Sequence, residues 1–333
     1  MKETIKAMSR TLIAVAAFFV LFGTVKNEAA AKVVQTAQTQ NSITVNVTGY
    51  SSYYTINKVS FGVGADYNAA KANASAGQIN NGKSLTYTFN NLQPGTEYCI
   101  AASVTYKSGS YTNTSVESAA LVTLPGTVTG LNQEEWYRLA HAVNIVWNKQ
   151  TGADGYEYRF MNDDGIDIEH STTSSARLSV SHIKNNQVYK GTVRAYSTIN
   201  GVKYYSDWCP TAYFMTQPAK GPTRGYENRE LGASVSGGKL KVNWEKVKGI
   251  NQYNVYVATK RGGAFKKVKT LGANKKSYTV KKVGKKKIKG NKTYYVYVEG
   301  VKIVNGNRYT TGLNYITQVK GHRTECLYVS SWK

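Results

Sequence analysis

Apolar and polar residues alternate along much of the chain after residue 32. In Val143–Trp147, Leu240–Trp244 and Tyr294–Val298, every second side chain is large and apolar. A period of two predicts β-strands that bury one face. The pairs Asn200-Gly201 and Asn305-Gly306 follow such segments, and Asn-Gly is a strong short-range signal for a β-hairpin. The pattern therefore predicts an all-β protein built from antiparallel strands.

One spacing of residues occurs three times. A branched apolar residue stands six positions before a tyrosine that starts an alternating segment, in the pairs Leu92 and Tyr98, Ile183 and Tyr189, and Ile288 and Tyr294. In a β-sandwich, a tyrosine at the start of a core strand can bury its ring while its hydroxyl bonds to backbone a few residues upstream. The spacing predicts three sandwiches with Tyr98, Tyr189 and Tyr294 as corner residues.

Two tryptophans lie on alternating segments upstream of the second and third corners. A large ring at Trp147 or Trp244 would fill the space between two sheets about 10 Å apart. The first segment has no tryptophan at this place and carries Ile43, Val45 and Val47 instead. Trp147 and Trp244 are therefore predicted core residues.

This order of residues resembles the fibronectin type III domain, in the form found in secreted bacterial proteins. Gly-Ala-Asp-Gly-Tyr at 152–156 follows Trp147, and Leu-Gln-Pro-Gly-Thr-Glu-Tyr occupies 92–98. An immunoglobulin domain would carry Cys two residues after the corner tyrosine. At those positions the chain has Ile100, Gly191 and Val296. The resemblance implies tandem immunoglobulin-like, fibronectin type III β-sandwiches, which are usually non-catalytic spacers and binding modules.

Joints rich in proline and glycine at 124–126 and 217–222 divide the chain. The predicted units are a divergent first unit at 32–125, a second unit at 126–218, and a Lys-rich third unit at 219–333 that ends in a short tail. Each of the first two is close to the roughly 100 residues of such a sandwich.

Residues 1–31 have the three parts of a secretory signal peptide: a basic start, an apolar run at 11–22 and small residues at 29–31. An uncleaved anchor is the alternative interpretation. No second long apolar run follows, so no transmembrane span is expected in the mature form. The predicted location is secreted, or attached to the cell surface without a covalent link.

Net charge is distributed unevenly over these pieces. The chain carries 43 Lys and Arg against 19 Asp and Glu, a formal charge of +24. The third unit alone holds 26 basic and 5 acidic residues, a charge of +21, whereas the first unit is at +2 and the second at −1. Self-repulsion at +21 would be relieved by a polyanion. The alternative is a solvated, solubilising surface.

Lysine accounts for most of the positive charge in the third unit. Lysine is a strongly hydrated point charge, so its excess over arginine favours salt-sensitive attraction over base or sugar readout. We therefore predict an anionic cell-wall polymer or polysaccharide as partner, teichoic acid among them, and no sequence-specific nucleic acid. The candidate residues are Lys266, Lys267, Lys269, Lys275, Lys276, Lys281, Lys282, Lys285, Lys286, Lys287, Lys289 and Lys292.

Two tyrosines of the third unit alternate with its predicted core residues. Tyr295 and Tyr297 are therefore expected to face outward, as an exposed aromatic platform.

No motif for catalysis or cofactor binding is evident. The acidic stretch 162–169 lacks the spacing of a calcium-binding helix-loop-helix, and its Asp-Gly pair is itself a turn signal. No cofactor, catalytic residue or metal site is predicted. Cys99, Cys209 and Cys326 lie far apart and are interpreted as structural or incidental.

Three hypotheses for function remain. In the first, the chain is an exported, non-catalytic spacer and binding protein whose third unit contacts an anionic surface polymer. In the second, it is an adhesin-like module whose first or second unit binds a protein ligand through loops or a strand edge. In the third, it is a fragment whose enzymatic partner is encoded elsewhere.

Overall fold

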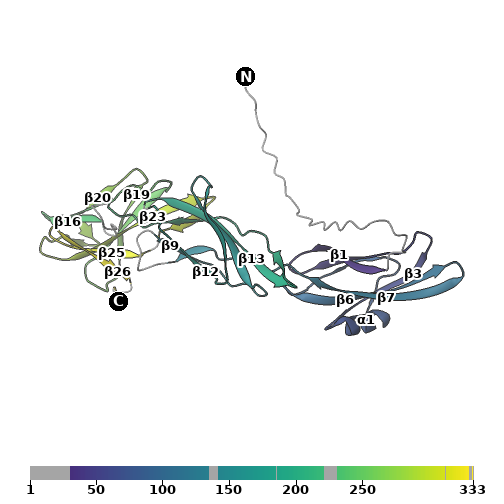
Figure 1. Cartoon of the computed structure of the whole chain (residues 1–333). Helices are drawn as coiled ribbons and strands as arrows, with labels where there is room; N and C mark the ends of the chain where they lie inside the picture. The colour runs from purple at the N-terminus through teal and green to yellow at the C-terminus, as the bar shows by residue number, and fades with distance from the viewer. Residues whose placement is uncertain are drawn as a thin grey trace, which may run out of the picture.

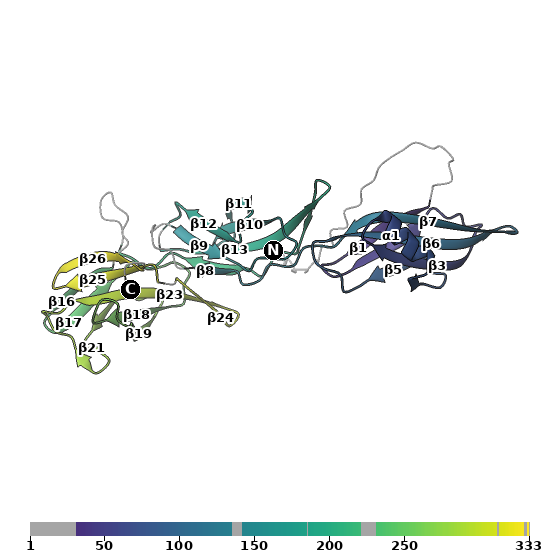
Figure 2. The same ribbon diagram turned by 90° about the horizontal axis from the view of Figure 1, so that it is seen from below.

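The computed structural model describes residues 31–134, 142–184, 186–220, 231–311, 313–329 and 332. The predicted signal peptide lies outside these residues, apart from Ala31. The described chain consists of antiparallel strands and a single helix, arranged as three units that follow one another in an elongated molecule (Figures 1 and 2). The predicted all-β class with tandem sandwiches is confirmed. No described helix is long and apolar enough to cross a membrane.

The first unit is a sandwich of a three-stranded and a four-stranded sheet. Its strands are β1 (Lys32–Gln38), β2 (Ile43–Thr48), β3 (Thr55–Gly64), β4 (Ile79–Asn80), β5 (Thr86–Phe89), β6 (Glu97–Ser108) and β7 (Tyr111–Val122). One sheet has the order β1-β2-β5 and the other β4-β3-β6-β7. The inward-facing residues of both sheets form one core, with Ile43, Phe61 and Ile100 fully buried.

The helix α1 (Tyr67–Ser75) lies between β3 and β4 in the chain and was not predicted. The Asp66 side chain caps it by accepting a hydrogen bond from Ala69 N at 2.7 Å. Ala70 and Ala74 are fully buried against the sheet. A Cβ added at Gly62 would lie 2.2 Å from Ala74 N, so the absence of a side chain there lets the helix backbone touch the sheet.

The second unit repeats this arrangement without the helix. Its strands are β8 (Asn132–Glu134), β9 (Ala142–Val146), β10 (Gly155–Asn162), β11 (Asp167–Thr173), β12 (Arg177–Ser181), β13 (Val188–Ile199), β14 (Val202–Tyr205) and β15 (Ala212–Met215). The sheets are β12-β9-β8 and β11-β10-β13-β14, and β15 also pairs with β13.

The third unit has the same strand order with two additions. Its strands are β16 (Gly232–Ser236), β17 (Lys239–Asn243), β18 (Gln252–Ala258), β19 (Lys266–Gly272), β20 (Ser277–Val280), β21 (Lys282–Val283), β22 (Lys286–Lys287), β23 (Tyr294–Val304), β24 (Asn307–Thr310), β25 (Tyr315–Lys320) and β26 (Arg323–Tyr328). The sheets are β16-β17-β20 and β19-β18-β23-β25-β26. The additions are the hairpin β21–β22 and the edge strand β26, which is formed by residues expected to be a tail.

All three units therefore share one strand order, which is that of a fibronectin type III sandwich. With the hairpin β21–β22 and β26 set aside, the first, second and fifth strands form one sheet, and the third, fourth, sixth and seventh form the other. In the second and third units an eighth strand, β15 or β25, also pairs with the sixth. The resemblance seen in the sequence is confirmed at the level of the fold.

The corner tyrosines each bond to backbone upstream. Gln93 N donates to the Tyr98 hydroxyl at 2.8 Å, and Lys289 N donates to the Tyr294 hydroxyl at 2.8 Å. The Tyr189 hydroxyl donates to the Lys184 carbonyl at 2.8 Å. Each bond clamps the loop that crosses from one sheet to the other.

A second pair of tyrosine corners escaped the sequence analysis. The hydroxyl of Tyr156 accepts from Gln150 N at 2.9 Å, and that of Tyr253 accepts from Val247 N at 2.7 Å. The rings of Tyr156 and Tyr253 pack edge-on against the buried Trp147 and Trp244 at centroid distances of 5.3 and 5.2 Å. The spacing of six residues between backbone donor and tyrosine is visible in the sequence of both units.

The second and third units share a packed junction. Tyr213 and Tyr309 pack with ring centroids 5.2 Å apart, and Lys302 Nζ donates to the Gly249 carbonyl at 2.6 Å while lying 3.7 Å from an Asp163 carboxylate oxygen. Val188 of the second unit belongs to the same buried cluster as the core of the third. The two units therefore contact each other directly through side chains of both.

Candidate functional site

Nine of the twelve candidate lysines lie at one end of the third unit. Strand direction places them there, because β20 ends and β23 begins at that end, and the turn from β18 into β19 is also there. We call this surface the lysine end, formed by Lys266, Lys267, Lys281, Lys282, Lys285, Lys286, Lys287, Lys289 and Lys292. All nine side chains are exposed.

The five-residue expansion seen in the sequence folds as the hairpin β21–β22. Lys282 pairs with Lys287 across it, and Val283 anchors it in the core at 6% exposure. Gly284 turns the hairpin with φ +58°, and a Cβ there would lie 3.3 Å from the ammonium of Lys266. The hairpin thus carries its own lysines beside that of β19, so that like charges lie close together.

The lysine end faces away from the second unit. The junction with that unit is made by Lys248, Lys302 and Tyr309, which lie toward the opposite end of the third sandwich, the last two on the β23–β24 hairpin. Figure 2 shows the β21 hairpin at the free end of the molecule. A long polymer could therefore contact this end without meeting the other units.

The structure separates the remaining three candidates from the lysine end. Lys269 lies in the middle of β19, opposite Val255. Lys275 and Lys276 lie in the turn from β19 to β20, where the Lys276 carbonyl accepts from Trp244 N at 2.9 Å. That turn is at the junction end of the sandwich.

Other cations that the sequence analysis did not single out join the lysine end. The turn from β16 to β17 lies there because Leu240, near the start of β17, pairs with Val280 at the end of β20, and Val235 N of β16 donates to the Gly321 carbonyl of the β25–β26 turn at 2.6 Å. The added residues include Lys239, Lys260, Lys320 and Arg323. The sequence alone does not show that these residues lie together, because the strand order decides which turns lie at the same end of the sandwich.

The lysine end has no carboxylate partner in the described part of the chain. None of the nine lysines forms an ion pair with a described residue. The Glu299 side chain is held elsewhere, accepting from Arg308 at 2.7 Å and from Asn254 at 2.8 Å. The positive charge of this end is therefore not neutralised locally.

The expectation of an exposed platform at Tyr295 and Tyr297 is wrong for Tyr295. Its side chain is 8% exposed, because Trp332 packs edge-on against it at 4.9 Å and the β25–β26 pair adds Ile316 and Leu327 beside it. The ring of Tyr297 is half-buried and stacks on Tyr256 at 4.6 Å. The alternation of residues along β23 correctly predicted that both rings lie on the outer face of the sheet. The C-terminal segment covers that face at Tyr295.

The acidic stretch of the second unit forms a hairpin turn and a surface ion pair. Gly165 has φ +93° in the turn between β10 and β11. Asp167 accepts hydrogen bonds from Nε and Nη2 of Arg159, the shortest at 2.9 Å, and this contact lowers the pKa of Asp167. Among the described residues, no group of three or more His, Cys, Asp or Glu could hold a metal ion.

A charged network covers the outer face of the second unit. Glu157 accepts from Arg194 at 2.8 Å and lies 2.7 Å from His170 Nε2. Burial opposes its charge, but the bonds to Arg194 and His170 outweigh burial and hold the pKa of Glu157 below its usual value. Arg194 in turn lies over the rings of Tyr205 and Trp208, at 4.1 and 4.6 Å from the centroids. The charged groups of this network are therefore paired with one another and with aromatic rings.

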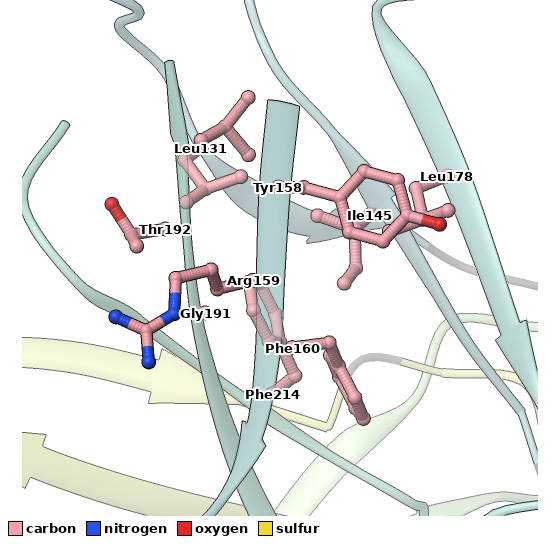
Figure 3. Close-up of a pocket in the computed structure, with 10 residues that line it drawn as sticks. Leu131, Ile145, Tyr158, Arg159, Phe160, Leu178, Gly191, Thr192 and Phe214 are labelled. Carbon is pink, nitrogen blue, oxygen red and sulfur yellow. The ribbon is translucent and has the colours of Figure 1, made fainter. Parts of the chain in front are cut away.

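A small cavity lies between the sheets of the second unit. Its volume is about 10 Å³, room for about one water molecule. Figure 3 shows a lining that is mainly apolar, with Leu131, Ile145 and Phe214 among its residues. The cavity is a packing gap in the core, too small for an organic substrate.

The three cysteines form no disulfide. Cys209 is buried, and its sulfur accepts from Val193 N at 3.3 Å. Burial and, to a smaller extent, Glu97 and Asp66 raise the pKa of the Cys99 thiol.

No protein-family model and no curated protein matches the chain. Among solved structures, a two-domain fibronectin type III segment of chicken tenascin is 13% identical, covers 56% of this chain and 99% of its own, and has a TM-score of 0.36. The FN1–FN3 domains of chicken CNTN1 are 15% identical, with coverage of 90% and 97% and a TM-score of 0.28. The structure called FN3tt mut is 22% identical, with coverage of 28% and 96% and a TM-score of 0.23. The fold is established by the strand order and corner bonds of this chain.

Proposed function

We propose that this chain of three fibronectin type III-like sandwiches is an exported, non-catalytic protein whose lysine end binds an anionic surface polymer. Export is supported by the signal-peptide pattern in residues 1–31. A non-catalytic role fits a described chain that consists of packed sandwiches and corner bonds.

The observation that carries the proposal is the concentration of unpaired lysines at a free end. Nine exposed ammonium groups share that end without an ion pair to a described carboxylate. Bringing a polyanion to them relieves self-repulsion and releases counterions from the polymer. Lysine provides no bidentate geometry, so attraction depends on the charge density of the polymer and not on its sequence.

Teichoic acid is the polymer class we favour for an exported protein of bacterial type. It is a flexible chain of regularly spaced phosphates, and lysine ammonium groups bind phosphate as point charges. An acidic polysaccharide is the alternative within the same proposal.

The test compares two full-length variants that lose the same number of charges at different places. The end variant carries Lys282→Gln, Lys285→Gln, Lys286→Gln and Lys287→Gln. The control variant carries Lys246→Gln, Lys248→Gln, Lys275→Gln and Lys276→Gln, which lie toward the junction. Binding to immobilised teichoic acid is measured at 50 mM and 500 mM salt, with dextran as the neutral polymer.

We expect the end variant to bind at least tenfold more weakly at 50 mM salt and the control variant to stay within about threefold of wild type. Binding of the wild type is expected to be lost at 500 mM salt. Equal losses in both variants would show that net charge alone acts and that the lysine end is not a site. Absence of wild-type binding at 50 mM salt, or equal binding at both salt concentrations, would refute the proposal.

A further inference from the structure

The first unit ends in a surface of unusual composition. The loop from β2 to β3 reads Gly-Tyr-Ser-Ser-Tyr-Tyr-Thr at 49–55, and the β6–β7 turn with its flanks reads Tyr-Lys-Ser-Gly-Ser-Tyr-Thr at 106–112. Every residue of the two segments except Lys107 is Tyr, Ser, Gly or Thr. We call this surface the tyrosine tip, with its rings at Tyr50, Tyr53, Tyr54, Tyr106 and Tyr111.

The fold brings the two segments together at the free end of the first unit. β3 pairs with β6, with Ile56 opposite Tyr106 and Thr55 opposite Lys107. The other end of this unit meets the second unit, where Asn200 donates to Glu97 at 3.3 Å. In Figure 1 the far ends of β6 and β7 extend away from the second unit. The tyrosine tip is therefore exposed at the end of the molecule opposite the third unit.

Part of the tyrosine tip is held rigid. Tyr106 packs edge-on against Tyr50 at 5.2 Å and stacks on Tyr54 at 4.9 Å. The hydroxyl of Tyr50 is hydrogen-bonded to Ser115 on β7. A second cross-strand bond joins the hydroxyls of Thr105 and Thr114 at 3.0 Å. These contacts fix the base from which the outer rings project.

Two rings project from that base into solvent. Tyr53 is 91% exposed and Tyr111 is 75% exposed, the two largest exposures among the exposed large hydrophobic side chains of the described chain. A tyrosine ring offers a large contact area and a hydroxyl while fixing only two torsion angles on binding. Exposed tyrosines on a rigid base therefore lose little conformational entropy when a partner covers them.

We propose that the tyrosine tip binds a folded protein, in the manner of an antibody paratope. The equivalent loops of an immunoglobulin variable domain are binding loops, and such loops are enriched in Tyr, Ser, Gly and Asn. A single lysine among fourteen residues excludes the electrostatic binding of a polyanion here. The Tyr, Ser and Gly composition favours a protein ligand, and a sugar chain stacking on the open faces of Tyr53 and Tyr111 is the alternative that the test separates from it.

This inference does not depend on polymer binding by the third unit. It assigns a protein ligand to the first unit, so the molecule would hold different partners at its two ends. Loss of polymer binding at the lysine end would leave protein binding at the tyrosine tip unaffected, and loss of protein binding would leave polymer binding unaffected.

The test places a photo-crosslinking benzoylphenylalanine at position 53 of the full chain, in 500 mM salt to suppress contacts of the lysine end. The probe is the mixture of secreted and surface proteins of the source cells. A matched chain carries the crosslinker at Tyr67, which is 51% exposed on α1, near the other end of the same unit. The competitors are unlabelled wild type and the double variant Tyr53→Ser, Tyr111→Ser.

We expect one discrete protein adduct from position 53 and none from position 67. Wild type should compete for it, and the double variant should compete at least tenfold more weakly. The purified partner should show the same tenfold loss in Kd with the double variant, whereas Tyr67→Ser binds normally.

Five outcomes overturn the inference. Three of them are no adduct, the same adducts from both positions, and equal competition by wild type and double variant. The fourth is an adduct whose attached component is removed by periodate, which would identify a glycan. The fifth is a crosslink to a second copy of this chain, which would show self-association in place of binding to a different protein.

Discussion

The hydrogen bond at the Tyr253 corner of the third unit offers a sharp test of what stabilises these sandwiches. Tyr253 is fully buried, and its hydroxyl accepts the N–H of Val247, itself 3% exposed, at 2.7 Å. Tyr253→Phe keeps the ring and its contact with Trp244, but it leaves a buried backbone N–H without its partner. Such a loss costs about 1–3 kcal/mol of unfolding free energy.

The assay is urea unfolding of the full chain, followed by tryptophan fluorescence. With an m-value of about 1–3 kcal/mol/M, a loss of about 2 kcal/mol lowers the midpoint of the third-unit transition by about 0.7–2 M. Trp244 lies 5.2 Å from the Tyr253 ring, so its emission reports on this unit.

Tyr278→Phe is the matched control in the same unit. Its ring is half-buried against the core, and its hydroxyl bonds to no described residue. We expect a change below about 0.5 kcal/mol. If Tyr253→Phe unfolds at the wild-type midpoint, or if both variants lose the same stability, the corner hydrogen bond is not what stabilises the fold.

Two further predictions concern the first and second units. Gly62→Ala places a Cβ 2.2 Å from Ala74 N, so it should displace α1 and destabilise the first unit by about 1–3 kcal/mol, as measured by thermal unfolding. Gly272→Ala, whose added Cβ has no atom within 4 Å, should have little effect. An unchanged melting temperature for Gly62→Ala would show that α1 does not need this close approach. Because the folded-state pKa of Glu157 is lowered, its contribution to stability is present above its usual pKa of 4.5 and is lost as pH falls through the lowered value. Glu157→Gln should therefore be less stable than wild type at pH 7, with the difference shrinking in acid. A difference that persists at pH 2 would contradict the role of the charge.

Local spacing predicted the parts of the fold that depend on local geometry. The six-residue interval before Tyr98 and Tyr189 correctly predicted a loop of fixed length between two sheets. The pair Asn200-Gly201 correctly predicted a hairpin turn, with positive φ at both residues. The helix α1 was missed, although Asp66 followed by alanine-rich sequence is a helix-start signal.

The candidate site was predictable in composition but not in placement. Lys275 is only six residues from Lys281, yet β20 separates them along the length of the sandwich. Lys239 and Arg323 reach the lysine end through turns that are distant in sequence. Burial of Tyr295 depends on Trp332, 37 positions away, and no local pattern shows which segment covers a face.

The salt dependence of polymer binding tests the central claim most directly. The slope of log Kobs against log salt counts the counterions released, at about 0.7 per contact on a single-stranded polyanion. We predict that the variant lacking Lys282, Lys285, Lys286 and Lys287 has a slope shallower by about 3 on teichoic acid, with the slope of the junction-side control unchanged. Identical slopes for wild type and both variants would contradict a contact at the lysine end.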